Sequence, residues 1–180
     1  PKIQNLNISG CGYLTNISFE TNCRSLKTFS CKNSAITAIR FGRQNDFPNY
    51  LDLSPFLLTS VSFENCPRVV NIKGLNYDGS GARMFYGCGN LVTIETLANG
   101  KLKCNNLSEF ATNCAKLTTL PANLDFTTAT NASDAFWGCS ALSKSECKRV
   151  AKSCPKITSG SRMFCGTKTG TLDEDFFSNM

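Results

Sequence analysis

Cysteine is the residue type with the greatest chemical potential in this chain, which contains eleven Cys and no His. A thiol becomes nucleophilic as a thiolate, and neighbouring cations favour that form. Cys147 and Cys154 meet this condition, because Lys and Arg are frequent in the stretch 144–152 beside them. Without His, however, no Cys-His or Ser-His-Asp arrangement can form, and no imidazole can bind a metal. The sequence therefore supports reactive cysteine chemistry only weakly.

Metal and disulfide chemistry also match the cysteine spacing poorly. Structural zinc sites favour C-x-x-C pairs, whereas the two closest cysteines here are Cys147 and Cys154. An odd number of cysteines does not fit a complete disulfide framework either. We expect no metal and no cofactor, and we interpret most cysteines as small, buried, apolar side chains with free thiols.

Acidic residues give no better case for catalysis. A glycosidase needs two carboxylates held roughly 5–10 Å apart. The acids of this chain are scattered, and the run Asp173–Asp175 lies in a polar stretch. We therefore predict that the protein is not an enzyme and has no catalytic residues.

The cysteines belong to a repeated phrase in which a Phe precedes a Cys and an apolar residue follows it. Two examples are "MFYGCGNL" (84–91) and "AFWGCSAL" (135–142). Seven phenylalanines recur with successive sequence intervals of 22, 22, 22, 25, 26 and 28: Phe19, Phe41, Phe63, Phe85, Phe110, Phe136 and Phe164. Five cysteines follow at a nearly fixed offset: Cys23, Cys66, Cys88, Cys114 and Cys139. This period predicts a solenoid in which the phenylalanines stack in one row and these cysteines are buried and unbridged.

Short runs of alternating apolar and polar residues indicate the strands of this solenoid. One series begins at Leu14, Ile36 and Leu58 with "LTNISF", "ITAIRF" and "LTSVSF". A second series contains "LKTFSC", "VVNIKG" and "LVTIET". A period of two with many β-branched residues is typical of strands. We expect the two series to lie on opposite walls of the coil.

The second half allows one helix. Ser143 and Glu146 form a capping box, so the chain is predicted to be helical over 144–153, with its basic residues on a solvated face. The predicted fold class is an α/β solenoid, a right-handed, leucine-rich-repeat-like stack of short parallel strands. It is mostly β, with short helices or 3₁₀ turns on the outer wall of the C-terminal half. We expect one solenoid over 1–180, as part of a longer array, with a turn length of about 22 in 1–78 and about 25–28 in 79–180.

The words of the second half resemble a known repeat. "RMFYGCGNL", "DAFWGCSAL" and "SRMFCGTKTGTL" are similar to the unit of the BspA-like leucine-rich repeats of bacterial surface proteins and of mycoplasma-type surface lipoproteins. The resemblance covers residues 80–180. It implies an extracellular or cell-surface adhesion module that binds a protein or glycan on a host or cell surface. Similar repeats in viral tail fibres imply a virion fibre as the alternative, and no catalytic residues are implied.

The outward residues of the strands are the candidate binding surface. We expect one wall to carry Thr28, Ser30, Asn71, Lys73, Thr93, Glu95 and Thr119. The other wall is expected to carry Asn16, Ser18, Ala38, Arg40, Ser60 and Ser62. We predict that the first wall binds the partner, because it mixes charged, amide and hydroxyl groups. An inert solvated surface and the basic helix at 144–153 are the alternatives. Lys73 and Glu95 are expected to be neighbours that can pair with each other.

The charge distribution argues against nucleic acid as the partner. The formal net charge is +6, but apart from 144–152 the Lys and Arg residues are scattered rather than gathered on one face. No apolar run reaches the roughly 18 residues of a membrane span, so we expect no membrane insertion. A structural spacer within a larger surface protein or viral fibre is the alternative function, and the oligomeric state is left open.

Overall fold

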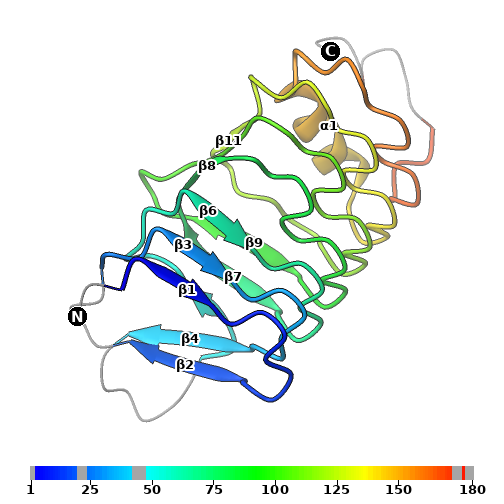
Figure 1. The fold of residues 1–180 in the computed structure, drawn as a ribbon. Coiled ribbons are helices and arrows are strands. Elements are labelled where there is room, and N and C mark those ends of the chain that lie inside the picture. The colour runs from blue at the N-terminus through cyan, green and yellow to red at the C-terminus, as the bar shows by residue number, and fades with distance from the viewer. Residues whose placement is uncertain (1–2, 20–23, 42–47, 172–175, 177–180) are drawn as a thin grey trace.

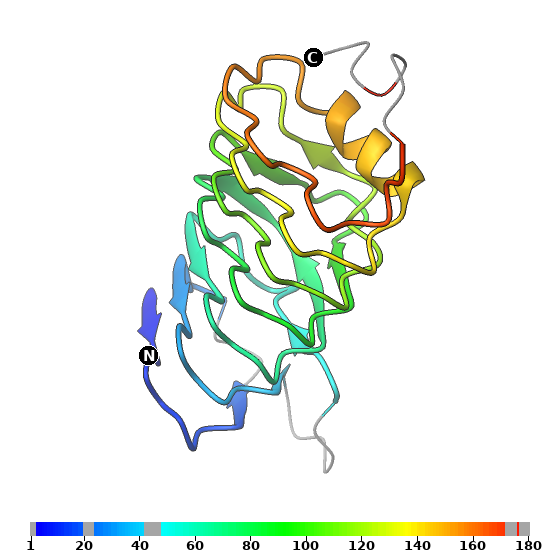
Figure 2. The same ribbon diagram turned by 90° about the vertical axis from the view of Figure 1, so that its right-hand side faces the viewer.

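The chain forms a solenoid of parallel strands with one short helix near its C-terminal end (Figure 1). The computed structural model describes residues 3–19, 24–41, 48–171 and Phe176. Seen from the side, successive turns stack on one another from the N-terminus to the C-terminus (Figure 2). Inward-pointing Leu, Ile, Val and Phe side chains form one continuous core along the coil. Stacking is what buries them, because a single turn exposes both of its faces.

Three parallel sheets form the walls of the coil. Wall A contains β1 (Asn5–Asn7), β3 (Thr28–Ser30) and β6 (Ser60–Ser62), in this order. Wall B contains β2 (Asn16–Phe19), β4 (Ala38–Phe41), β5 (Leu51–Asp52), β7 (Asn71–Leu75) and β9 (Thr93–Thr96). Wall C contains β8 (Tyr77–Gly79), β10 (Leu102–Cys104) and β11 (Leu124–Asp125). The strands are short because the chain must turn a corner between walls.

The phenylalanines form two rows, so the prediction of a single row is wrong. Phe19 stacks on Phe41 beside wall B, with ring centroids 5.5 Å apart. The longer row starts at Phe29 after a step to wall A, and Phe63 stacks on Phe85 at 5.4 Å. This row continues through Phe110, Phe136, Phe164 and Phe176. Phe41 and Phe63 are therefore separated by the regular interval of the repeat although they lie beside different walls.

A short step in wall B causes this change of phase. Ile39 pairs with Leu51, which follows it closely in the chain, and Leu51 pairs with Ile72. Wall B thereby gains β5 as an additional strand. Wall A has no additional strand at this level, so Phe29 pairs directly with Val61 in β6. The run "LTSVSF" consequently lies on the wall opposite to the one its spacing predicts.

The cysteine of the repeat occupies an inward corner. Cys66, Cys88, Cys114 and Cys139 are buried and unbridged, as predicted. Each of their thiols donates a hydrogen bond to a main-chain carbonyl of the preceding turn. The acceptors are the carbonyls of Cys31, Phe63, Phe85 and Ala111, at Sγ–O distances of 2.7, 2.9, 3.0 and 3.1 Å. Cys23 lies outside the described residues.

A left-handed residue precedes each of these corners and makes the chain turn inward. Equivalent positions in seven turns have positive φ angles: Gly10, Asn33, Asn65, Gly87, Asn113, Gly138 and Gly166. Glycine and asparagine are the residues that adopt this conformation most readily. A Cβ at Gly87 would in addition lie 2.3 Å from the side-chain oxygen of Asn65 in the turn below.

Helix α1 (Lys144–Lys152) is the single α-helix of the described part of the chain. The Ser143 side chain accepts a hydrogen bond from the Glu146 amide, so the predicted N-cap is confirmed. Glu146 does not complete the capping box, because its carboxylate instead accepts hydrogen bonds from the Leu120 amide and from Arg149. Arg149 also donates to the carbonyls of Leu120 and Pro121. Two charged side chains of the helix, Glu146 and Arg149, therefore attach it to the turn below through hydrogen bonds to the main chain.

Candidate binding groove on wall A

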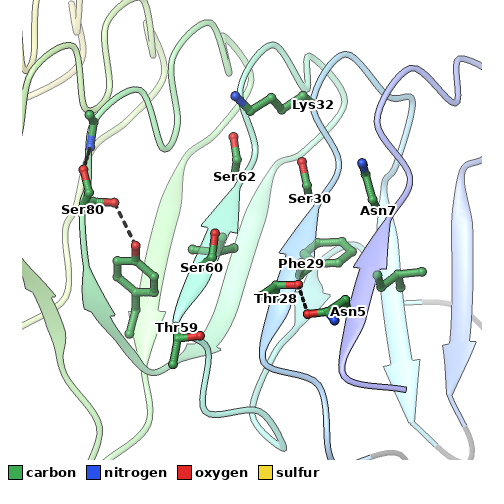
Figure 3. Close-up of a pocket in the computed structure, with 14 residues that line it drawn as sticks. Asn5, Asn7, Thr28, Phe29, Ser30, Lys32, Thr59, Ser60, Ser62 and Ser80 are labelled. Atoms are coloured by element: carbon green, nitrogen blue, oxygen red, sulfur yellow. Dashed lines mark hydrogen bonds between the residues drawn. The ribbon is translucent and has the colours of Figure 1, made fainter. Parts of the chain in front are cut away.

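The outer face of wall A is hollowed into an open groove of about 610 Å³ (Figure 3). Parallel pairing places Asn5, Thr28 and Ser60 in one row across the strands. A second row follows two positions further along each strand and contains Asn7, Ser30 and Ser62. Neighbouring strands lie about 4.8 Å apart, and alternate residues of one strand about 6.6 Å apart. The two rows therefore form a small regular grid of hydroxyl and amide groups.

The alternation of each strand explains why this grid is polar. Each of the three strands reads polar-apolar-polar, with Leu6, Phe29 and Val61 as the middle residues. Phe29 and Val61 are buried in the core, and Leu6 packs against it at the open end. The core thus fixes the strands from behind, while both flanking side chains point outward.

Hydrogen bonds hold part of the grid in place and leave other groups available. Thr28 Oγ1 donates to Asn5 Oδ1 at 2.7 Å, and the hydroxyls of Ser9 and Ser30 share a hydrogen bond of 2.8 Å. Within the described residues, the exposed hydroxyl of Ser60 makes no hydrogen bond. The grid is therefore partly ordered before any partner binds.

A ledge formed by residues 77–82 closes the groove on the C-terminal side. The Tyr77 hydroxyl donates to the Ser80 carbonyl at 2.8 Å and so shapes the ledge. Burial raises the pKa of Tyr77 to about 12, which keeps this hydroxyl neutral and able to donate. A Cβ at Gly79 would lie 2.6 Å from the Tyr77 hydroxyl, so the ledge requires glycine there.

Among the described residues that line the groove, Lys32 is the one with a charged side chain, and it lies at the upper margin (Figure 3). Its ammonium lies 3.0 Å from Glu64 Oε2. Glu64 also accepts from Arg83, whose Nη2 lies 2.7 Å from Glu64 Oε1. Burial opposes the charge of Glu64, yet the hydrogen bonds from Arg83 and Lys32 lower its pKa below the usual value. The charge of Lys32 is therefore balanced by Glu64.

Above the groove, the same side of the coil carries charged residues with left-handed backbone: Arg83, Glu109, Asp134 and Arg162. Arg83 forms an ion pair with Glu109, and Arg162 Nη2 donates to Asp134 Oδ2 at 3.0 Å. The two guanidinium groups also face aromatic rings, Arg83 over Tyr86 at 3.8 Å and Arg162 over Trp137 at 5.8 Å. We call this column the ion ladder.

The structure separates the seven residues that the sequence predicted as one partner-binding wall. Thr28 and Ser30 lie in the groove on wall A. Wall B carries the other five, which are Asn71, Lys73, Thr93, Glu95 and Thr119. The sequence predicts Ser60 and Ser62 on the opposite wall, whereas in the structure they pair with Thr28 and Ser30 and complete the groove. The grouping is wrong because the short step from β4 to β5 shifts the phase of the repeat between the two walls.

Asn5 and Asn7 were missed by the sequence reasoning, although a signal for them exists. The words "NLN", "TFS" and "SVS" share the order polar-apolar-polar and occupy the three strands of wall A. Their unequal spacing in the chain hides this likeness, because it departs from the regular period of the phenylalanines.

Three of the five predicted binding residues on wall B, Asn71, Lys73 and Thr93, contact another outward residue or an aromatic ring. Thr93 Oγ1 donates to Asn71 Oδ1 at 2.8 Å. Lys73 lies over the ring of Tyr50 at 4.5 Å, and no ion pair joins it to Glu95 in the part of the chain that the structure describes. A smaller depression of about 440 Å³ includes Thr93, Glu95 and Thr119. The outer face of wall B therefore carries charged side chains, and its depression is smaller than the groove on wall A.

Cys147 and Cys154 do not have the properties of reactive thiols. Both are buried, and burial raises the pKa of each to about 11. They therefore remain protonated at neutral pH. No cluster of three or more His, Cys, Asp or Glu side chains within the described ranges is placed to hold a metal ion. The described part of the chain also contains no helix that is long and apolar enough to span a membrane.

Comparison of the chain with family models, with curated proteins and with solved structures finds no match.

Proposed function

We propose that the protein is a non-enzymatic binding module and that the groove on wall A takes a neutral, hydroxyl-rich glycan of a cell or host surface. The observation that carries this proposal is the grid of six hydroxyl and amide side chains, Asn5, Asn7, Thr28, Ser30, Ser60 and Ser62. Hydroxyl and amide groups both donate and accept hydrogen bonds, as the hydroxyls of a sugar require. An apolar core behind the strands keeps the grid rigid, which lowers the entropic cost of binding.

Charge favours a neutral partner over a charged one. Neither row of the grid contains an ionisable side chain, and Lys32 at the margin is paired with Glu64. A strongly anionic partner such as nucleic acid lacks a cationic surface to bind here. An extended segment of a protein, which offers main-chain donors and acceptors, is the second partner class that this surface suits.

The cellular setting of this proposal rests on the resemblance to BspA-like leucine-rich repeats over residues 80–180. A location on a bacterial cell surface, outside the cell or on a virion fibre follows from that resemblance. So does the interpretation of each turn as a leucine-rich-repeat-like unit. A spacer that only projects another domain is the alternative, and such a protein would have no surface that binds a partner.

Binding of the purified chain to an array of immobilised neutral and charged glycans tests the proposal. Ser30→Tyr places a ring in the middle of the grid, and tyrosine is well accepted in strands. Thr93→Tyr is the matched control, because it adds the same side chain at an outward strand position of wall B. We expect Ser30→Tyr to weaken binding at least about tenfold, and Thr93→Tyr to leave it unchanged while both variants remain folded.

Three other results would contradict parts of the proposal. If Thr93→Tyr or the double change Lys73→Ser with Glu95→Ser abolishes binding and Ser30→Tyr does not, wall B is the site. If only an extended protein segment is bound, the partner class is wrong although the groove is right. If the protein binds neither glycans nor proteins of whole cells, the spacer is the better function.

A further inference from the structure

Two buried thiols, Cys31 and Cys66, lie against each other in neighbouring turns next to the groove. Their sulfur atoms are 3.5 Å apart, and Cys66 Sγ is also 2.7 Å from the Cys31 carbonyl oxygen. Both side chains are fully buried and unbridged. Among the described cysteines, this is the one pair whose thiols are in hydrogen-bonding contact. Sulfur atoms at this distance need to approach by only about 1.5 Å to reach bonding distance.

The contact exists because Cys31 departs from the repeat. Main-chain pairing places Cys31 at the position taken in later turns by Phe63, Phe85 and Phe136. Where that position is a phenylalanine, the corner thiol of the next turn lies against the main chain of the phenylalanine, as Cys88 lies against Phe63 and Cys114 against Phe85. A small side chain at Cys31 instead leaves its sulfur beside that of Cys66. This pair is therefore a local exception and not a consequence of the cysteine repeat.

The surroundings make Cys66 the more acidic thiol of the two. The hydrogen bond between the side chains of Cys66 and Cys31, assisted by Ser34, lowers the pKa of Cys66 to about 7 in spite of burial. Burial raises the pKa of Cys31 well above its usual value. A thiolate beside a protonated thiol is the arrangement in which one sulfur is oxidised and the other resolves it.

A surface depression leads to this pair. It has a volume of about 360 Å³ and is lined by residues on both sides of Cys66, including Asn65 and Pro67. Ser34 lines the same depression, and its hydroxyl lies 3.8 Å from Cys66 Sγ. Ser34 therefore lies against both the depression and Cys66, and a displacement of its side chain would give a small molecule access to the thiol.

We propose that Cys31 and Cys66 are a redox-sensitive pair that a small peroxide converts into a disulfide between two turns of the solenoid. The Cys66 thiolate attacks the peroxide, its sulfur forms a bond to oxygen as the O–O bond breaks, and one water leaves after protonation. The Cys31 thiol then displaces hydroxide from the resulting sulfenic acid, which leaves as a second water. Two electrons pass from the two sulfurs to the peroxide, and an external thiol reverses the change.

The disulfide would link the turn of β3 to the turn of β6. The segment between Cys31 and Cys66 contains the additional strand β5. The disulfide would therefore enclose the longer of the two connections between neighbouring strands of wall A. Such a bond restricts the unfolded chain and stabilises the fold. Ser30 directly precedes Cys31, and Ser62 pairs with it across the two strands. Oxidation would therefore hold the strands that carry Ser30 and Ser62, at the centre of the grid, more rigidly together.

The test is controlled oxidation of the folded chain, followed by mass spectrometry of proteolytic peptides. The background carries Cys165→Ser, because Cys165 is exposed and would react first. With hydrogen peroxide we expect a mass loss of about 2 Da and a cross-linked pair of peptides containing Cys31 and Cys66. We also expect the oxidised form to unfold at a higher urea concentration, and dithiothreitol to restore the original midpoint.

The variants use residues that the chain itself places at equivalent positions. Cys31→Ala copies Ala111, and Cys66→Ser copies Ser34, so both are expected to fold. Each should abolish the mass loss and the shift of the midpoint, whereas Cys88→Ser, a buried thiol one turn further, should preserve both. Peroxide that leaves all buried thiols intact would overturn the proposal, as would a bridge between other cysteines. None of these readouts depends on glycan binding, so this proposal and the proposed function can fail separately.

Discussion

One side of this solenoid changes character half-way along its length. In the lower turns it is the groove on wall A, where three strands present neutral hydroxyl and amide groups. In the upper turns the same side bends through left-handed residues, and the ion ladder replaces the grid: Arg83, Glu109, Asp134 and Arg162. Beneath both regions the same row of phenylalanines continues, and each region has a buried corner cysteine, Cys66 beneath the groove and Cys139 beneath the ion ladder.

The difference shows that the inward and outward positions of this repeat have separate tasks. Inward residues are restricted by packing, since any void or excess volume costs stability. Outward residues are free to differ. The charged residues of the ion ladder form ion pairs with one another, whereas the grid leaves groups such as the Ser60 hydroxyl available. We therefore expect substitutions beneath the two regions to have equal effects and substitutions on their surfaces to have different ones.

The largest effect is expected in the shared core. Phe63 below the groove and Phe136 below the ion ladder are both fully buried between two other rings. Each substitution by Ala should lower the free energy of unfolding by about 3–5 kcal/mol, because the cavity cannot collapse between stacked neighbours. Urea denaturation followed by circular dichroism measures this. A clearly smaller loss for one of the two would mean that the row is not equally packed in both regions.

A smaller effect is expected when the ion ladder is cut. Arg83→Met removes the partner shared by Glu64, whose side chain is only 15% exposed, and Glu109. The expected loss is about 1–2 kcal/mol, between the values for exposed and for buried ion pairs. Ser60→Ala in the grid is the contrasting change and should alter stability by less than about 0.5 kcal/mol. Equal losses for the two variants would remove the distinction between the surfaces.

Glu64, which pairs with Arg83 of the ion ladder, should also make stability depend on pH. The folded-state pKa of Glu64 lies below its usual value of 4.5, so its contribution is present above that pH and is lost as the pH falls through the folded-state pKa. The melting temperature should decline as the pH is lowered from 6 to 3, a range of roughly one to two units on either side of that value. Thermal unfolding at a series of pH values measures this. In Glu64→Gln this part of the decline should be missing, and an unchanged pH profile would contradict the assignment.

The smallest effect concerns the left-handed corner that both regions share. Asn113 has a φ angle of 62°, which alanine adopts only at a cost. Asn113→Ala should lower the free energy of unfolding by about 1 kcal/mol, whereas Asn113→Gly should change it by less than about 0.5 kcal/mol, since glycine relieves strain but is more flexible when unfolded. Chemical denaturation of the two variants distinguishes them, and the opposite ranking would show that the Asn side chain itself matters.

The sequence by itself determined the features that depend on one turn and its immediate repeat. The Phe and Cys positions point inward because their period matches the stacking of turns, and the thiols are buried as expected. The helix begins at Lys144 because the hydroxyl of the preceding residue, Ser143, caps it locally. Such features need only nearby residues and a regular period, which the amino-acid sequence displays directly.

Only the tertiary structure decided which wall each strand joins. The choice depends on the pairing of Ile39 with Leu51, a short step along the chain. The Gly, Asn and Pro residues between them indicate a turn, but they do not show which strand the next segment pairs with. That step moves β6 to wall A, brings Ser60 and Ser62 beside Thr28 and Ser30, and creates the groove. It also brings the turn of Cys31 directly against that of Cys66. The physical reason is that parallel pairing joins residues far apart in the chain, so one short turn changes the partners of every outward residue after it.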